Sequence, residues 1–340
     1  MKKAFTLIEL IVVLIIMGIL ATIAVEILLK VSKNYVISKA ENRIVFEEDL
    51  IINKIAAKLE NRIPNSVIAT ECNATNNDCK NGNVKGFISM QDLTENNAYK
   101  YPVIEWLAKD IYSRRGEWNS SLKRIIPGWS GFVDLKKTQR NANDDYNITI
   151  PYSDINIIQD IDGNWTEAWG INGYKNVFEN NLSVLIFSGP DGRGAFNDIN
   201  HSYGWYKTMY SDNKAQKVFA IIKDDINTTL NNATIRVKTI DDTNDTTVYE
   251  GFFIVKGADA IVPVYNAGTN DYNLTFIQNY YPWKDENYTD GNSSLLATHV
   301  VQFKFRQDGG MMRIYLCIQD PKVDMGDNQK LTICKEKVVF

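Results

Sequence analysis

Asparagine residues recur in this chain at a spacing that could support a covalent modification. In the sequon Asn-x-Ser/Thr, the side-chain amide of the asparagine is the acceptor of an N-linked glycan. Because a glycan is bulky and polar, each acceptor has to lie on the surface of the protein. We single out eleven asparagines that begin such a sequon: Asn73, Asn119, Asn147, Asn164, Asn181, Asn227, Asn232, Asn244, Asn273, Asn287 and Asn292.

Ten of these eleven sequons also have an acidic residue two positions before the asparagine. These acids are Glu71, Glu117, Asp145, Asp162, Glu179, Asp225, Asp242, Asp271, Asp285 and Asp290, whereas Asn232 has Leu230 in that place. Asp and Glu occupy 41 of 340 positions, so chance gives about one acid among eleven sequons. Loops rich in Asn and Asp explain many sequons, but hardly ten acids at one offset. The extended pattern resembles the acceptor of the bacterial periplasmic N-oligosaccharyltransferase, which implies a multiply glycosylated head.

The four cysteines form two local pairs, Cys72 with Cys79 and Cys317 with Cys334. Separations of seven and seventeen residues fit small disulfide loops in an oxidising compartment. Four cysteines allow three connectivities, so the local pairing is an inference. A zinc site is the alternative, but no Cys-x-x-Cys spacing supports it. We therefore favour two disulfides.

Other chemical signals in the chain are weak. His201 and His299 are the only histidines, which argues against histidine-based catalysis or a histidine-rich metal site. A Walker A loop, a Gly-x-Ser-x-Gly elbow and a His-Glu-x-x-His motif are all missing from the sequence. The net charge is −4 and the isoelectric point is about 5.4, so nucleic acid is not indicated as a partner. We therefore expect that the protein is not an enzyme.

The N-terminal segment has the composition of a membrane anchor. Leu10 to Val25 contains no charged residue, and the 25 residues from Phe5 to Leu29 would form about 37 Å of helix. That length spans a hydrocarbon layer of about 30 Å. Lys2 and Lys3 precede the apolar run, and positive residues stay on the cytoplasmic side. The rest of the chain should then lie outside the cytoplasm, in agreement with disulfides.

Glu9 distinguishes this segment from an ordinary secretory signal. A cleavable signal would end in a small-x-small site, but here the apolar run continues into Glu26 and Lys30. A carboxylate at the start of a membrane helix is costly unless it finds a partner. Glu9 is therefore a candidate functional residue.

The residues around Glu9 carry a resemblance to a known family. Lys2-Lys3-Ala4-Phe5-Thr6-Leu7-Ile8-Glu9 resembles the prepilin signal of type IV pilins and type II secretion pseudopilins. The resemblance implies that a prepilin peptidase cuts between Ala4 and Phe5 and that Phe5 becomes N-methylated. It also implies that Glu9 neutralises the Phe5 amine of a neighbouring subunit, since a buried carboxylate is tolerable only when paired. Two departures are Ala4, where the family usually has glycine, and Glu26, where major subunits commonly have proline.

Beyond the anchor, the sequence predicts an amphipathic continuation of the same helix. Ile44, Ile51, Ile55 and Leu59 repeat at helical spacing. The expected segments are a leader at 1–4, a transmembrane helix at 5–29 and a stalk helix at 30–63, which Pro64 stops. The apolar stripe should pack under a sheet, whereas a free coiled coil would need sustained heptads.

The remainder reads as a head that is mostly β. Residues 64–181 are rich in Asn, Asp, Tyr and Trp, and we interpret them as an irregular insertion. Residues 182–340 contain alternating apolar runs that are typical of antiparallel strands, with a tight turn at Gln307-Asp308-Gly309-Gly310. The predicted fold class is α+β: a long N-terminal transmembrane-plus-amphipathic helix packed under a mostly antiparallel β head with irregular insertions.

Two head segments add to the resemblance. The tail from Leu295 to Asp320 resembles the end of PilW-like minor pilins and GspJ-like minor pseudopilins. The loop from Ser188 to Gly194 resembles the Gly-Pro-Asp-Gly loop of some calcium-binding pseudopilins, which implies that Asp191 and Asp198 hold calcium. A plain glycine turn explains the same loop residues. No other cofactor is expected.

The resemblance implies a minor pilin or pseudopilin that primes or caps a filament of the type IV pilus or type II secretion kind. Such filaments serve secretion, DNA uptake or pilus biogenesis. An adhesin-like or ligand-binding tip subunit on the same membrane anchor is the alternative. Expected partners are other pilin or pseudopilin subunits, the prepilin peptidase and the inner-membrane assembly platform. The expected location is the inner membrane, single-pass, with the C-terminal head in the periplasm, and later the filament at the cell surface.

Overall fold

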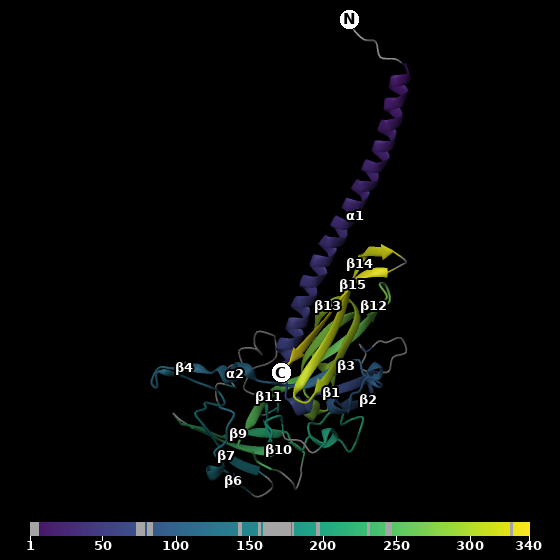
Figure 1. The fold of residues 1–340 in the computed structure, drawn as a ribbon. Coiled ribbons are helices and arrows are strands. Elements are labelled where there is room, and N and C mark those ends of the chain that lie inside the picture. The colour runs from purple at the N-terminus through teal and green to yellow at the C-terminus, as the bar shows by residue number, and fades with distance from the viewer. Residues whose placement is uncertain are drawn as a thin grey trace.

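One uninterrupted helix, α1 (Leu7–Leu59), leads into the head and ends a few residues before Pro64. Its 53 residues correspond to a length of about 80 Å. In Figure 1 the N-terminal part of α1 projects from the head, and its C-terminal part lies against the strands. The computed structural model describes residues 7–72, 79, 84–141, 145–155, 158, 178, 180–194, 198–229, 232–241, 247–326 and 329–340.

The head is built around one large sheet of thirteen strands, in which every described pair is antiparallel. Its main path runs in the order β15-β14-β13-β12-β11-β8-β9-β10-β7-β6, and β3, β1 and β2 branch from β11. The strands of this sheet are β1 (Ile68–Cys72), β2 (Val84–Ser89), β3 (Val103–Lys109), β6 (Gln139–Arg140), β7 (Asp145–Pro151), β8 (Val184–Phe187), β9 (Phe219–Thr228), β10 (Asn232–Thr239), β11 (Phe252–Asn266), β12 (Asp271–Tyr280), β13 (Asn292–Asp308), β14 (Met311–Gly326) and β15 (Gln329–Val339).

Short elements complete the head. A separate hairpin pairs β4 (Glu117–Asn119) with β5 (Arg124–Ile126), directly after the short helix α2 (Ile111–Arg115). Single 3-10 turns lie at η1 (Pro64–Ser66), η2 (Met90–Asp92), η3 (Ala98–Lys100), η4 (Leu135–Lys137), η7 (Ile199–His201), η8 (Pro282–Lys284) and η9 (Tyr288–Asp290).

Strand β11 joins the two halves of the head because it changes partners along its length. We call β6, β7, β8, β9 and β10 the far half of the head, and the other strands of the sheet the near half. The first residues of β11, Phe252 to Val255, pair with β8 of the far half. Val255 also pairs with Lys109 of β3, and from Ala258 to Ile261 the strand has β12 on one side and β3 on the other. The register shifts between Val255 and Ala258, where Gly257 has a φ of +140°. Glycine adopts that conformation without the penalty of a side chain, so the bulge fits this position.

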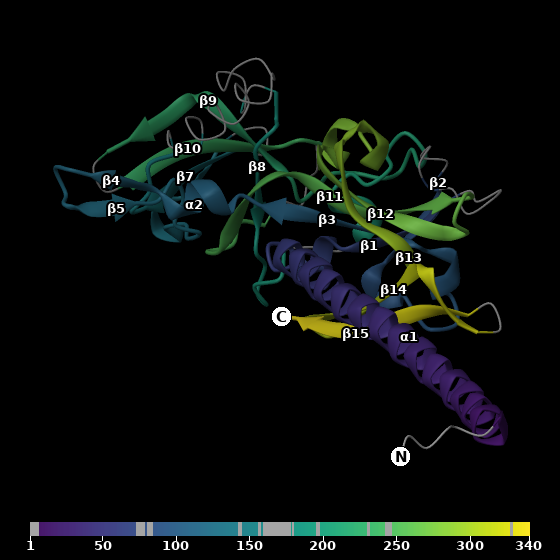
Figure 2. The ribbon, with the colours of Figure 1, turned by 90° about the horizontal axis from the view of Figure 1, so that it is seen from above.

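A near core forms where α1 packs on the sheet. Ile52, Ile55 and Leu59 of the helix are essentially fully buried against Ile314 and Leu316 of β14 and their neighbours. Figure 2 shows α1 crossing the region of β14 and β15. Side chains pack on one face of a helix at intervals of three and four residues, and the sequence places isoleucine and leucine at those intervals.

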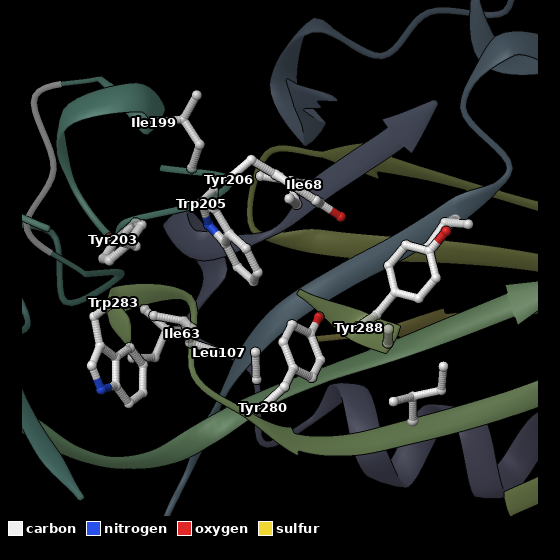
Figure 3. Close-up of a cluster of buried hydrophobic side chains, with 14 of the residues drawn as sticks. Ile63, Ile68, Leu107, Ile199, Tyr203, Trp205, Tyr206, Tyr280, Trp283 and Tyr288 are labelled. Carbon is white, nitrogen blue, oxygen red and sulfur yellow. The ribbon is translucent and has the colours of Figure 1, made fainter. Parts of the chain in front are cut away.

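A second core of the near half is rich in aromatic residues (Figure 3). Tyr203, Trp205, Tyr280 and Tyr288 are among its fully buried members. Glu105 of β3 is fully buried beside this core and accepts hydrogen bonds from the hydroxyls of Thr70, Tyr206 and Tyr280, the last at 2.7 Å. Burial raises the pKa of the Glu105 carboxyl. Three hydroxyl donors offset part of the cost of burying this group.

The far half has its own core between β7, β8, β9 and β10. Ile148, Ile150, Ile221, Ile235 and Val237 are fully buried there, with other apolar neighbours. These residues alternate along their strands with less buried ones, the period of a half-buried strand.

The predicted fold class is confirmed: the long helix lies against a large antiparallel sheet. The turn predicted at residues 307–310 joins β13 to β14, with Asp308 opposite Met311. The structure adds that β1 and β3, from the stretch interpreted as an insertion, lie within the main sheet. Their residues Ile68, Ile104 and Trp106 are fully buried.

Candidate functional site

The first half of α1 makes no buried contact with the head. Every side chain from Leu7 to Val36 is exposed, and Ala40 is the first buried residue of the helix. By length and apolar composition, this helix is able to cross a membrane. The Thr22 hydroxyl donates a hydrogen bond to the Ile19 carbonyl at 2.8 Å, so this polar group is satisfied within the helix, as a lipid environment requires.

Glu9 lies in the first turn of α1 on this exposed segment. A negative group near a helix N-terminus interacts favourably with the helix dipole. Yet a carboxylate at the edge of an apolar span also favours a cationic partner. Ala4 and Phe5, the predicted processing residues, lie outside the described residues.

The second half of α1 is fixed to the head by polar contacts around its apolar stripe. Arg43 forms an ion pair with Asp320 of β14, and Asp49 forms one with Lys335 of β15. The Lys58 ammonium lies 4.6 Å from the centre of the Phe276 ring. The Asp49–Lys335 pair is exposed on both sides and contributes little to stability, whereas Asp320 is buried, so its pairing with Arg43 offsets part of the cost of burying that carboxylate.

Arg62 ties the end of the helical segment to two distant parts of the chain. Its guanidinium is buried and donates to the carbonyls of Leu59 at 2.8 Å, Gly310 at 2.8 Å and Phe340 at 3.4 Å. Gly310 lies in the β13–β14 turn and Phe340 is the last residue. The single side chain therefore connects the helix, that turn and the last residue of the chain.

Glu48 is an acidic residue that is buried in the contact between α1 and the sheet. It is 2% exposed, and burial raises its pKa from 4.5 to about 7, against the opposing effect of Lys335. Within the part of the chain that the structure describes, its Oε1 atom has no hydrogen-bond partner. A carboxyl in this environment binds a proton more readily than it does in water.

The outer face of α1 is apolar from the end of its first half into its second half. Tyr35, Phe46 and Leu50 are 67%, 70% and 47% exposed. At 100° per residue these three lie within about 60° of one another, on the side opposite Ile44 and Ile55. We call Tyr35, Phe46 and Leu50 the outer stripe. Aromatic and aliphatic side chains on the free face of a helix are suited to packing against another helix.

Both predicted disulfides are present in the structure. Cys72 and Cys79 have Cα atoms 5.3 Å apart, and Cys317 and Cys334 have Cα atoms 4.0 Å apart. Cys317 and Cys334 are directly opposite each other in β14 and β15. This second bridge fastens the strand pair on which α1 rests.

The predicted glycan acceptors lie in different settings. Asn119, Asn147, Asn181, Asn227, Asn232, Asn273, Asn287 and Asn292 are described, and none of these is buried. Asn227 and Asn292 are exposed, while Asn147 and Asn273 lie within central strands. Asn73, Asn164 and Asn244 fall outside the described residues.

One candidate acceptor was missed from the sequence. Asn200-His201-Ser202 is a further sequon, and Asp198 stands two positions before its asparagine. Asn200 is exposed at η7. The signal that identifies it is the one at the other sites, an acid two positions before the asparagine of a sequon.

The residues predicted to bind calcium have contacts within their own loop. Asp191 pairs with the Arg193 guanidinium at 2.9 Å. Asp198 accepts hydrogen bonds from the backbone of Asn200 and His201 and lies 2.7 Å from the His201 ring. Among the described residues, no group of three or more His, Cys, Asp or Glu side chains is arranged to hold a metal. Calcium binding stays a prediction.

A basic and aromatic surface on the far half was also missed from the sequence. Residues 111–140 contain seven basic and two acidic residues, although the whole chain has a net charge of −4. Large apolar side chains are exposed on the same stretch and just after it: Tyr112, Trp118, Ile125, Phe132, Leu135 and Tyr152. We call residues 111–140 together with Tyr152 the basic lobe. The net charge of the whole chain does not reveal this local excess of basic residues, because acidic residues elsewhere outweigh it.

Cation–π contacts and strand pairing hold part of the basic lobe together. Arg124 lies 5.4 Å from the ring of Tyr152, and Arg115 lies 5.7 Å from that of Tyr112. Trp118 and Ile125 are opposite each other in the β4–β5 hairpin. In Figure 2, β4, β5 and α2 lie at the end of the head opposite the free end of α1.

Comparison with known proteins explains the first part of the chain. Residues 1–25 match the family described as the prokaryotic N-terminal methylation motif. The match includes Ala4, Phe5 and Glu9 and ends before the second half of α1, which packs on the sheet and which we call the docked half. No curated protein and no solved structure matches the chain. The match does not reach the C-terminal strands, so the resemblance of the tail to particular minor subunits stays a prediction.

Proposed function

We propose that this protein, which carries the N-terminal methylation motif of type IV pilins and pseudopilins, is a minor subunit that primes or caps a filament of that kind. Cleavage between Ala4 and Phe5 would free the Phe5 amine, and N-methylation leaves it cationic. Glu9 of the adjacent subunit would then pair with that amine as helices stack. The apolar helix and the motif are consistent with an inner-membrane anchor and a periplasmic head.

The observation that supports assembly most is the division of α1. Its side chains from Leu7 to Val36 are all exposed, and Phe46 and Leu50 of the outer stripe stay exposed farther along, although the opposite face is buried. A monomer would leave this apolar stripe in water beyond the membrane. Packing against the helices of neighbouring subunits would bury it, at about 25 cal/mol per Å² of apolar surface.

The width of the head supports a position at the end of a filament. The far half extends sideways from the axis of α1 (Figures 1 and 2). Subunits along a filament shaft have neighbours on every side of the helix. A head this broad fits more easily where no further subunit follows, which favours a priming or capping role.

Replacement of Glu9 by valine tests the proposal. We expect Glu9→Val to abolish incorporation into sheared filaments or detergent-extracted subunit complexes, measured by immunoblot and cross-linking, because an unpaired amine would remain in the membrane. Membrane insertion and the protease resistance of the head should be unchanged. Normal incorporation of the variant contradicts the proposal.

Glu26→Val is the matched control, because Glu26 is a second exposed carboxylate on the same half of α1. Glu26 lies at the other end of the apolar run, where it can reach the interface with water. This variant should assemble like the wild type. Equal loss with both variants would indicate a general effect of removing charge rather than pairing at Glu9.

The basic lobe favours a second candidate function, a ligand-binding tip. Arginine side chains beside exposed rings suit an anionic ligand with planar or ring-shaped groups. We expect full-length protein in neutral detergent to bind immobilised heparin, a sulfated polysaccharide, and to elute with rising salt. Arg114→Glu with Arg115→Glu should lower the salt needed for elution, whereas Lys58→Glu should not, because Lys58 lies on α1. Identical elution of all three proteins contradicts this function.

A further inference from the structure

The acidic sequons are the strongest pattern that filament assembly leaves unexplained. With Asn200 there are twelve sequons, and eleven have Asp or Glu two positions before the asparagine. Asp and Glu are 41 of 340 residues, so about one or two such acids are expected by chance. A repeated local fold could impose the offset, and the structure allows that explanation to be tested.

The acids at this offset have unrelated structural roles. Asp145 is buried in β7 and pairs with Arg236, and Asp271 is buried in β12 with one carboxylate oxygen 2.8 Å from the His299 ring. Asp198 caps η7, whereas Glu117 is exposed on a strand of the β4–β5 hairpin. The backbone conformations at this offset also differ, because Asp198 is extended, Asp285 is left-handed with a φ of +66° and Asp290 ends the 3-10 turn η9. The shared offset therefore does not come from the fold.

An enzyme that binds this segment would explain the offset, because it recognises the local sequence rather than the folded structure around it. Acids that have different structural roles within the head can all be recognised in the same way by an external enzyme. A carboxylate at a fixed distance from an amide suits a protein site with one cation and one reaction centre. The Asn-x-Ser/Thr part identifies the reaction as glycan transfer to the amide.

We propose that a periplasmic oligosaccharyltransferase modifies Asn119, Asn200, Asn227 and Asn292 of this head, and that it recognises the acid two positions before each asparagine. The donor class is an oligosaccharide linked to a lipid through pyrophosphate. The Nδ2 atom forms a bond to C1 of the first sugar as the bond from C1 to the pyrophosphate oxygen breaks. The lipid pyrophosphate leaves with the electron pair, the amide loses one proton, and nothing is oxidised or reduced.

Three of these four sites are the exposed acceptors among the described sequons, and Asn119 is one of several half-buried acceptors. Asn200, Asn227 and Asn292 are exposed, and Asn119 is half-buried where the β4–β5 hairpin begins to turn. An acceptor must leave its surroundings to enter an enzyme site, which is least costly at strand ends and turns.

The two acceptors inside the sheet would be reached at much greater cost. Asn147 is paired with Arg236 of β10 on one side and Gln139 of β6 on the other. Asn273 is paired with Val264 of β11, and β13 flanks its strand on the other side. Entry into an enzyme would break pairing on both sides, so we infer that a folded head is not modified at Asn147 or Asn273.

Asn232 is the internal control that the chain provides. It begins a sequon and is only partly buried at the start of β10, but Leu230 replaces the acid two positions earlier. An enzyme that requires the acid does not modify Asn232. A process that needs only the sequon and an accessible amide does not distinguish it from Asn119.

The test is glycopeptide mass spectrometry of the full-length protein from a bacterium that supplies the lipid-linked oligosaccharide, with and without an active oligosaccharyltransferase. We expect one glycan composition at Asn119, Asn200, Asn227 and Asn292, none at Asn232, and none anywhere without the enzyme. Unmodified asparagine at all four sites overturns the proposal, as does modification of Asn232 to the same extent.

Glu117→Gln tests recognition of the acid with little risk to folding, because Glu117 is exposed and the substitution keeps its shape. The glycan at Asn119 should be lost, whereas Glu117→Asp should retain it. The other three sites of the same molecule show whether the variant reached the enzyme in a folded state. Full modification of Asn119 in Glu117→Gln overturns the role of the acid. None of these outcomes depends on filament assembly.

Discussion

The two halves of α1 differ in what surrounds them, although they form one continuous helix. From Leu7 to Val36 the side chains are exposed all round, as suits a helix surrounded by lipid or by other helices. From Ala40 to Leu59 one face is buried against β14, β15 and their neighbours, and the other carries Phe46 and Leu50 of the outer stripe. The same secondary structure therefore serves two environments.

This difference shows where the stability of the head comes from. Substitutions in the docked half should act on the folding of the head, because they alter buried contacts. Substitutions in the exposed half should act only on insertion and association. Phe46 lies in the docked half but faces outward, so it provides the sharpest test of this division.

The largest effect on folding is expected for Ile55→Ala. The Ile55 side chain is 1% exposed in the near core, and deleting buried methyl groups leaves a cavity. We expect the free energy of unfolding of the head to fall by about 2–5 kcal/mol. Urea unfolding of full-length protein in detergent, followed by tryptophan fluorescence, measures this change.

Ile16→Ala is the matched control in the exposed half. Ile16 is 51% exposed, so the same deletion should change the free energy of unfolding by less than about 0.5 kcal/mol. Comparable losses in the two variants would contradict the division of α1.

A smaller effect that depends on pH is expected at Glu48. Burial raises the pKa of Glu48 from 4.5 to about 7, so the folded head favours the protonated carboxyl. The associated stability is fully present below pH 4.5 and is lost as the pH rises through about 7, a change of about 1–3 kcal/mol. Glu48→Gln should remove this part of the pH dependence, measured by urea unfolding between pH 4 and pH 8.

Glu47→Gln controls for the loss of one carboxylate from the same turn. Glu47 is exposed, and its replacement should leave the pH profile of the wild type. A Glu48→Gln profile that is as steep as the wild-type profile would show that Glu48 does not take up this proton.

The smallest effect on folding is expected for Phe46→Ser. Phe46 is 70% exposed on the outer stripe, so the free energy of unfolding should change by less than about 0.5 kcal/mol. Incorporation into filaments should nevertheless fall, because the polar side chain replaces an apolar contact, and Phe46→Leu should restore it. Quantitative immunoblots of sheared filaments measure incorporation, and unchanged incorporation of Phe46→Ser would exclude the outer stripe from assembly.

The parts of the fold that were predictable are those encoded by short-range periodicity. The spacing of Ile44, Ile51, Ile55 and Leu59 predicted which face of α1 is buried, and the alternating apolar runs in residues 182–340 predicted antiparallel strands. Glu9 could be singled out because a charge in an apolar run is conspicuous. Both cysteine pairs could be proposed because small separations favour local loops.

The features that were missed depend on contacts between distant residues or on charges that cancel in a total. The pairing of β3 with β11 joins segments that are about 150 residues apart, and no local pattern specifies a strand partner. The buried cluster around Glu105 draws its donors from Thr70, Tyr206 and Tyr280. The basic lobe was hidden by the acidic remainder of the chain.

By itself, the sequence determined the apolar N-terminal segment, its carboxylate, the helix that continues from it and the acidic sequons, because each is a pattern within a few consecutive turns or residues. Only the tertiary structure decided that β11 joins two halves of one sheet, that the outer stripe stays exposed, and which asparagines lie at strand ends. The physical reason is that periodicity states which side chains avoid water, whereas pairing and exposure depend on which distant segments meet.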